Sequence, residues 1–143
     1  MKTLVCLPTK NEKSNIEEMI KNIRMLNLDL IVVDENSKDG TIEVAKSCDI
    51  AVYQRDGAGK GCGVRKALDI ASELGYDNLV LIDCDNSYPS TYIPKLLDYL
   101  PYYDLVVGAR CMRDIQFSHR LVCLLYTSPS PRDLSTSRMP SSA

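Results

Sequence analysis

The chain has 143 residues, of which 45% are apolar and 25% are charged, and its formal net charge is −2. This length is enough for one globular domain with a hydrophobic core. The balanced charge, without any run of basic residues, excludes nucleic acid as the main partner. The six cysteines include no C-x-x-C pair and follow no signal peptide, which indicates reduced thiols in a cytosolic protein.

The first half of the chain alternates short apolar runs with helical patterns. Residues 3–7 predict a strand, and the capping-box pair Ser14 and Glu17 predicts the start of a helix with apolar residues at helical spacing. Residues 30–33 predict a second strand, which ends at a pair of acidic residues. The segment 39–41 predicts the capped start of a short helix rather than a ligand contact.

The alternation continues in the second half. Residues 50–53 predict a third strand, and a helix is expected after the glycine-rich segment 57–63. The apolar stripe of that helix is predicted to comprise Val64, Ala67, Leu68, Ala71 and Leu74. Gly75 is expected to end the helix.

Two more strands, over residues 78–82 and 105–107, and a helix over 90–100 complete the pattern. Regular alternation of strands and helices predicts an α/β fold with a doubly wound, mostly parallel sheet and right-handed crossovers. In such a sheet the carboxyl ends of all strands lie at one edge, where ligands bind. The loops after the strands are therefore expected to gather there.

The acidic pair Asp83 and Asp85 follows directly on the apolar run 79–82. Two neighbouring carboxylates repel each other unless a cation or a shared proton compensates them. A divalent ion that also bridges a diphosphate is a common solution, because Mg²⁺ prefers oxygen ligands. The pair therefore predicts metal-assisted chemistry on a phosphorylated nucleotide. The alternative is a helix cap or a solvated acidic turn.

Residues 57–63 place four glycines around Lys60, and Arg65 lies on the helix that follows. Glycines let a backbone approach phosphate oxygens, and the amino end of a helix favours anions. The segment follows the third strand, so it is a poor match to the dinucleotide fingerprint of a first βα turn. It is no P-loop, because Gly61 stands where that motif has Ser or Thr. A flexible, charged surface loop is the alternative.

The loops after the first two strands are also polar. Residues 8–12 could hold a nucleobase or ribose, or they could form only a turn with a helix cap. Asp34 could accept a hydrogen bond from a base or a ribose hydroxyl, or it could be a solvated acid of the turn.

Together these loops resemble the family 2 glycosyltransferases of GT-A fold, and most closely their dolichol- and polyprenol-phosphate mannose or glucose synthases. The resemblance covers residue 3 to about residue 115 in the order and spacing of the family. Its matching stretches are residues 7–12, 32–41, 59–61, 83–85 and 106–110. One departure is Lys10, where many synthases have Tyr.

The resemblance implies a role for each matching residue. Asp83 and Asp85 would bind Mg²⁺ or Mn²⁺ at the donor diphosphate, and Arg110 would contact an acceptor phosphate. The resemblance further implies that Pro8, Thr9, Glu12 and Asp34 bind the nucleotide, and the glycine-rich segment adds Gly59, Lys60 and Arg65 as further expected nucleotide-binding residues.

The resemblance also implies a domain organisation. Residues 1–122 would form the Rossmann-like, nucleotide-sugar-binding half of a GT-A domain, truncated before its acceptor half. Residues 123–143 are expected to be a disordered tail, because serine and proline dominate the stretch from Thr127 onward and apolar periodicity disappears there. This tail also looks like translated vector sequence, with a genuine flexible tail as the alternative.

The implied activity is metal-dependent, inverting sugar transfer from a GDP- or UDP-linked donor to a polyprenyl phosphate at the cytosolic face of a membrane. Two alternatives remain open. The chain could be a truncated fragment that binds a nucleotide sugar without catalysis. It could also be a sugar-1-phosphate nucleotidyltransferase, although that class usually has a glycine-rich basic loop after its first strand. The sequence leaves the base, the sugar and the oligomeric state undetermined.

Overall fold

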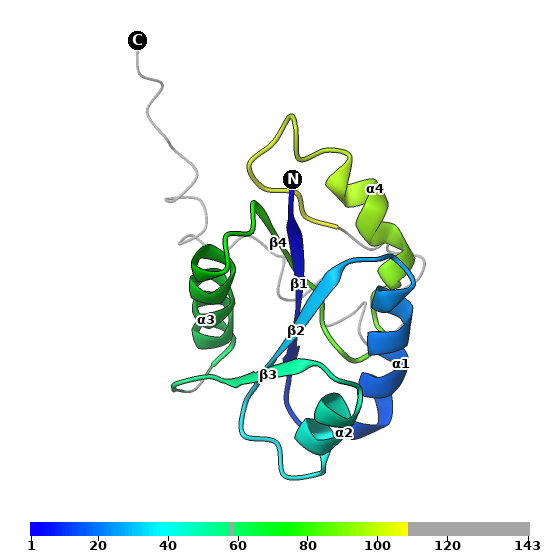
Figure 1. Ribbon diagram of the computed structural model, residues 1–143, viewed down its shortest axis with the longest axis vertical. Coiled ribbons are helices and arrows are strands. Elements are labelled where there is room, and N and C mark those ends of the chain that lie inside the picture. The colour runs from blue at the N-terminus through cyan, green and yellow to red at the C-terminus, as the bar shows by residue number, and fades with distance from the viewer. Residues whose placement is uncertain (58, 109–143) are drawn as a thin grey trace, which may run out of the picture. The chain divides into compact units, whose positions relative to one another are not determined.

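The computed structural model describes residues 1–57 and 59–108, and its described helices and strands all lie in the compact unit Met1–Val106 (Figure 1). Four parallel strands form one sheet in the order β3-β2-β1-β4. These strands are β1 (Thr3–Thr9), β2 (Asp29–Asp34), β3 (Ala51–Gln54) and β4 (Asn78–Leu81). The predicted α/β fold with a mostly parallel sheet is confirmed.

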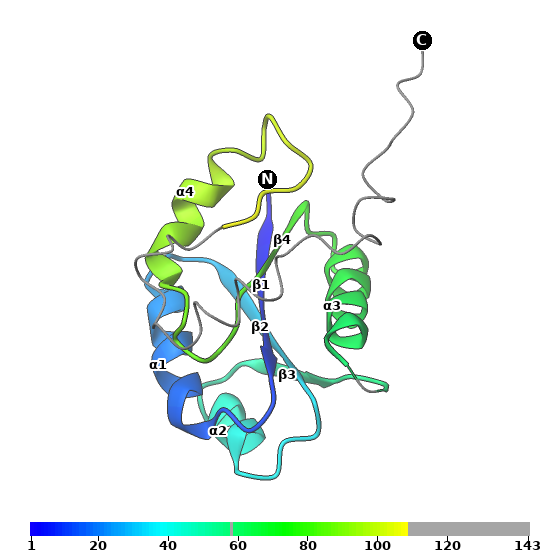
Figure 2. The same ribbon diagram turned by 180° about the vertical axis from the view of Figure 1, so that it is seen from behind.

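Helices cover both faces of the sheet, which is why the strands are almost continuously apolar. The helices α1 (Lys13–Arg24) and α2 (Thr41–Ser47) lie on one side, and α3 (Lys60–Glu73) lies on the other (Figures 1 and 2). A one-turn 3₁₀ helix, η1 (Ser90–Tyr92), leads into α4 (Ile93–Leu97) on the side of α1.

The side chains of β1 alternate between two hydrophobic cores. Val5 and Leu7 pack with α1, whereas Leu4 and Cys6 pack with α3. All four side chains are at most 1% exposed. Apolar packing therefore stabilises both faces of the sheet, and the ends of its strands are well-ordered attachment points for the loops that follow them.

The start of the first helix differs from the prediction. Helix α1 begins at Lys13, and Glu12 occupies the capping position without a side-chain capping bond. The predicted capping box is therefore wrong, and Glu17 instead forms an exposed ion pair of 2.7 Å with Lys21. The helix begins early because Asn11 turns the chain with a φ of 56°, so that the Glu12 carbonyl already accepts the amide of Ile16.

The buried face of α3 was predicted only in part. Leu68 and Leu74 are 53% and 51% exposed, whereas Ile70, which the predicted stripe omitted, is buried. The buried residues are Gly63, Ala67, Ile70 and Ala71. Small residues dominate this face because they let the helix approach the sheet closely. Gly75 follows the helix with a φ of 71°, in agreement with its predicted role.

The predictions for residues 90–107 need two corrections. The helix expected over 90–100 is a 3₁₀ turn followed by the five residues of α4. Residues 105–107 form no strand, and Leu105 is 79% exposed. A strand needs a neighbour for its backbone groups, and no strand in the described parts of the chain pairs with this segment.

Some predictions fall on residues that the structure does not describe. These include Arg110 and the tail 123–143, so the proposed domain boundary stays a prediction. Within residues 1–57 and 59–108, no helix has the length and apolar character needed to span a bilayer.

Candidate functional site

The loops after the four strands meet at one edge of the sheet, as predicted, and each turns through a residue with positive φ. These residues are Asn11, Asn36, Gly57 and Asn86, with φ values of 56°, 55°, 96° and 57°. Asparagine and glycine tolerate this left-handed conformation better than other residues do. The chain can therefore turn sharply at the carboxyl end of each strand.

Beneath this edge lies a buried carboxylate, that of Asp34 at the end of β2. Its exposed fraction is 0%. Asp34 Oδ2 accepts hydrogen bonds from the hydroxyls of Thr9, at 2.7 Å, and Ser37, at 2.6 Å, while its Oδ1 accepts the Ser37 amide at 2.7 Å. Two predicted nucleotide-binding residues, Thr9 and Asp34, thus contact each other and tie the ends of β1 and β2 together.

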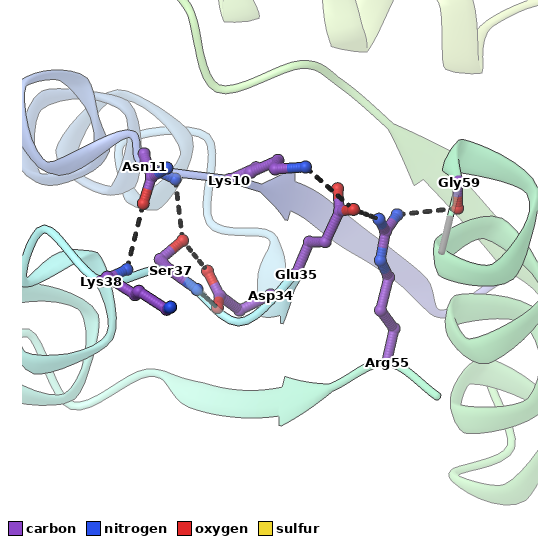
Figure 3. A network of polar contacts seen from close by, with 8 residues as sticks. All are labelled: Lys10, Asn11, Asp34, Glu35, Ser37, Lys38, Arg55 and Gly59. Carbon is purple, nitrogen blue, oxygen red and sulfur yellow. Dashed lines mark hydrogen bonds and ion pairs between the residues drawn. The ribbon is translucent and has the colours of Figure 1, made fainter. Parts of the chain in front are cut away.

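A second layer of contacts joins the first two loops above Asp34 (Figure 3). The Asn11 amide donates to Ser37 Oγ at 2.8 Å, and the Lys38 amide donates to Asn11 Oδ1 at 3.0 Å. Asp39 accepts the amides of Lys13 and Thr41, each at 3.0 Å. The side-chain bond from Thr41 is the main reason that the pKa of Asp39 is lowered. The helix α2 (Thr41–Ser47) therefore begins within the predicted segment 39–41, but its N-cap is Gly40, without a side-chain capping bond, and Asp39 accepts the Thr41 amide from one residue earlier.

A polar chain that was not predicted runs across three of the loops (Figure 3). Glu35 Oε1 pairs with Lys10 Nζ at 3.1 Å and with Arg55 Nη2, and Arg55 Nη1 donates to the Gly59 carbonyl at 2.7 Å. Arg55 directly follows β3, so its place at a strand's carboxyl end was the signal available in the sequence. The polar chain Lys10–Glu35–Arg55–Gly59 connects the loops after β1, β2 and β3.

A cavity of about 210 Å³ opens beside this polar chain at the ends of β2 and β3. Its lining residues are Glu35, Asn36, Gln54, Arg55 and Gly57. The lining carries a carboxylate, a guanidinium and two carboxamides, so it can both donate and accept hydrogen bonds. Such a cavity suits a small polar ring rather than a purely apolar ligand.

The acidic pair lies on either side of a buried residue. Cys84 is 2% exposed, the side chain of Asp83 is 41% exposed, and Asp85 is exposed. Asp83 Oδ2 lies 3.6 Å from Lys60 Nζ, and Asp85 Oδ1 accepts the Ser87 amide at 2.9 Å. The structure therefore brings the glycine-rich loop to the acidic pair, as the sequence led us to expect.

The donor set of this edge suits one kind of metal ion. Among the described residues there is no group of three or more His, Cys, Asp or Glu side chains that could enclose an ion. Mg²⁺ commonly binds with one or two carboxylates, several waters and the phosphates of a substrate. The exposed carboxylates of Asp83 and Asp85 fit that arrangement and do not fit a metal held by protein ligands alone.

The remaining predicted residues lie around the same edge, apart from Arg110, which is outside the described residues. Pro8 is half-buried in β1, and Glu12 Oε2 accepts Asn15 Nδ2 at 2.9 Å. Gly59 precedes α3 with a φ of 100°, and Arg65 is exposed on that helix.

Two of the described cysteines have thiols that lose their proton less readily than an ordinary cysteine does. Burial raises the pKa of Cys6 and Cys84 to about 12, and nearby carboxylates add to the effect at Cys84. Because the thiolate is the reactive form, we expect iodoacetamide to modify the half-buried Cys48 and Cys62 well before these two. Peptide mass spectrometry on the folded protein measures this order. Early modification of Cys84 would contradict its burial.

Curated relatives match most of the chain. Glycosyltransferase AglJ of Haloferax volcanii is 36% identical over 110 residues, which are 74% of this chain and 36% of that protein. Undecaprenyl-phosphate mannosyltransferase of Micrococcus luteus is 34% identical over 122 residues, or 77% of this chain and 49% of that protein. The chain thus spans between about a third and a half of the length of these relatives.

A solved structure and a family model agree with these relatives. Glucosyl-3-phosphoglycerate synthase from Mycobacterium tuberculosis, in complex with Mn²⁺, uridine-diphosphate and glucosyl-3-phosphoglycerate, superimposes with a TM-score of 0.61 at 32% identity. The match covers 69% of this chain and 39% of that one. The family model for glycosyl transferase family 2 matches residues 4–135. The chain therefore belongs to glycosyl transferase family 2.

Proposed function

We propose that this chain is the donor-binding part of a metal-dependent, inverting glycosyltransferase that moves a sugar from a nucleotide sugar to a polyprenyl phosphate. The observation that carries the proposal is the approach of Lys60 Nζ to Asp83 Oδ2, at 3.6 Å. It brings the glycine-rich loop and the acidic pair to one place at the ligand-binding edge of the sheet. The similar solved structure of glucosyl-3-phosphoglycerate synthase, with Mn²⁺ and uridine-diphosphate, supports a nucleotide diphosphate and a divalent ion as ligands.

On the nucleotide side, we assign Pro8, Thr9, Glu12 and Asp34 to the base and ribose. The carboxylate of Asp34 is engaged with Thr9 and Ser37, so a direct bond to a base requires that one of these contacts be exchanged. The cavity beside Glu35 offers further donors and acceptors within the same edge.

On the diphosphate side, the positive groups are Lys60 and Arg65 at the beginning of α3, where Gly59 gives the backbone freedom to approach a phosphate. Asp83 and Asp85 would hold Mg²⁺ or Mn²⁺. That ion would neutralise the charge that accumulates on the leaving nucleoside diphosphate. Lys60, in the glycine-rich loop, can neutralise part of the same negative charge.

On the acceptor side, a phosphomonoester has a second pKa near ~6 and is mostly an oxyanion at neutral pH. It can attack the sugar without a general base, whereas a sugar hydroxyl needs a positioned carboxylate. Arg110 is the proposed contact for that phosphate. The relative named undecaprenyl-phosphate mannosyltransferase supports a lipid phosphate, and such an acceptor would place the reaction at the cytosolic face of a membrane.

The test is transfer of radiolabelled sugar from GDP-mannose or UDP-glucose to a polyprenyl phosphate, alongside calorimetry of donor binding. We expect donor binding with Mn²⁺ or Mg²⁺ present and its loss in EDTA. Transfer to the lipid would support the whole proposal. Binding without transfer would support the alternative of a non-catalytic nucleotide-sugar-binding fragment, and absence of both would contradict the proposed function.

A further inference from the structure

Arg55 holds a position that the proposed roles do not explain. Its side chain is only 6% exposed, and an arginine is rarely buried to this extent unless its charge is paired. Its backbone amide donates to the Asp34 carbonyl at 3.2 Å and so continues the pairing of β2 with β3. The backbone of Arg55 is therefore held by the sheet, and its guanidinium extends from there toward the neighbouring loops.

The guanidinium joins two loops that are separate in sequence. Nη2 pairs with Glu35 after β2, and Nη1 donates to the Gly59 carbonyl at 2.7 Å. The same carbonyl accepts the Cys62 amide at 3.1 Å, in the first turn of α3. The Arg55 side chain thus binds the backbone at the beginning of α3.

The Arg55 side chain also packs against the first turn of α3, beside Gly63. A Cβ added to Gly63 would lie 3.7 Å from Arg55 Nη1 and 3.8 Å from its Cδ, which places the arginine in van der Waals range of this position of α3. Its Nε is buried and has no hydrogen-bond partner among the described residues. Because the charge is compensated by Glu35, loss of either partner would leave the other in an unfavourable environment.

We propose that Arg55 is a positioning residue for donor binding. By joining Glu35 to the Gly59 carbonyl, it holds the glycine-rich loop so that Lys60, the next residue, reaches the diphosphate side at Asp83. The inference rests on the proposed function and adds to it a coupling between the cavity at Glu35 and the acidic pair. Arg55 acts through Lys60 and need not touch the diphosphate itself.

The first test is calorimetry on the full chain with Mn²⁺, using UDP and uridine, and GDP and guanosine, as probes. Arg55→Lys keeps the charge but cannot bind Glu35 and Gly59 together with a planar fork. We expect it to lower the affinity for the diphosphate roughly tenfold. Binding of the nucleoside should change much less. The matched control is Arg24→Lys. Arg24 is the last residue of α1, and its guanidinium also donates to a backbone carbonyl, that of Cys48.

The second test is a double-mutant cycle with Lys60→Ala. If Arg55 acts by placing Lys60, the effect of Arg55→Lys on diphosphate affinity should nearly vanish in the Lys60→Ala background. A purely structural role would instead lower nucleoside and diphosphate binding alike and give additive effects. If Arg55→Lys fails to fold, Glu35→Gln in the same cycle tests the same chain of contacts.

The outcomes separate the two proposals. If the wild-type chain binds neither diphosphate with Mn²⁺, the proposed function is overturned and the inference falls with it. If the wild type binds, but the folded Arg55→Lys variant binds the diphosphate equally well or the cycle is additive, only the inference is overturned.

Discussion

Replacing Asp83 or Asp85 by asparagine should remove metal-dependent binding of a nucleotide sugar while leaving the domain folded. Asparagine keeps the size of the side chain but loses the negative charge that a divalent ion requires from an oxygen ligand. With few protein ligands available at this edge, each carboxylate should matter strongly. We expect the affinity measured by calorimetry with Mn²⁺ to fall on the order of 100-fold.

The fold should tolerate both changes because the pair contributes little to stability. The contact of Asp83 with Lys60 spans 3.6 Å, and the Lys60 side chain is 90% exposed. Exposed ion pairs of this kind are typically worth about 0–1 kcal/mol. Asp69→Asn, an exposed position on α3, is the matched control for both binding and stability. Unchanged nucleotide-sugar affinity in folded Asp83 and Asp85 variants would overturn the assignment of the metal site.

Asp34→Asn should instead destabilise the protein, by about 2–4 kcal/mol in the free energy of unfolding. The carboxylate is 0% exposed, and both its oxygens accept hydrogen bonds from Thr9 or Ser37. An asparagine has only one such oxygen. Whichever oxygen becomes the amide nitrogen, at least one donor, the Thr9 hydroxyl or a half-buried group of Ser37, loses its acceptor.

Urea unfolding of the wild type and the variant measures this difference. Thr9→Val, which removes one of the hydrogen bonds, should cost about 1–2 kcal/mol. The exposed Asp69→Asn should stay within about 0.5 kcal/mol of the wild type. A loss below about 0.5 kcal/mol for Asp34→Asn would mean that the bonds seen at the end of β2 add nothing to folding.

Asp34 also bears on how the site operates. Its bonds hold together the ends of β1 and β2, the two central strands of the sheet. A direct contact with a base and a structural role for this carboxylate compete for the same oxygens. Measuring both stability and nucleotide affinity of Asp34→Asn distinguishes them, because a residue that contacts only the base would change affinity without changing stability.

The predictions that failed share a cause. The capping box at Ser14 and the buried Leu68 were inferred from local patterns that fit more than one register. The competing signals, Asn11 in a left-handed turn and Ile70 on the sheet side of α3, depend on how the chain enters and packs each element. Local patterns locate a helix well, but its first residue and its buried face depend on contacts with the sheet.

The alternation of strands and helices, and with it the parallel sheet and the edge where the loops gather, could be predicted from the amino-acid sequence alone. The sequence also located the acidic pair and the glycine-rich segment, because apolar runs and glycines are local signals. Which side chains meet at that edge, however, depends on how the strands and loops are packed in space. Asp34 is buried beneath its neighbours. Arg55 contacts Glu35, which lies 20 residues earlier in the chain, and Gly59, which lies in the loop that directly follows Arg55. Such pairings depend on the register of neighbouring strands, which no local pattern contains.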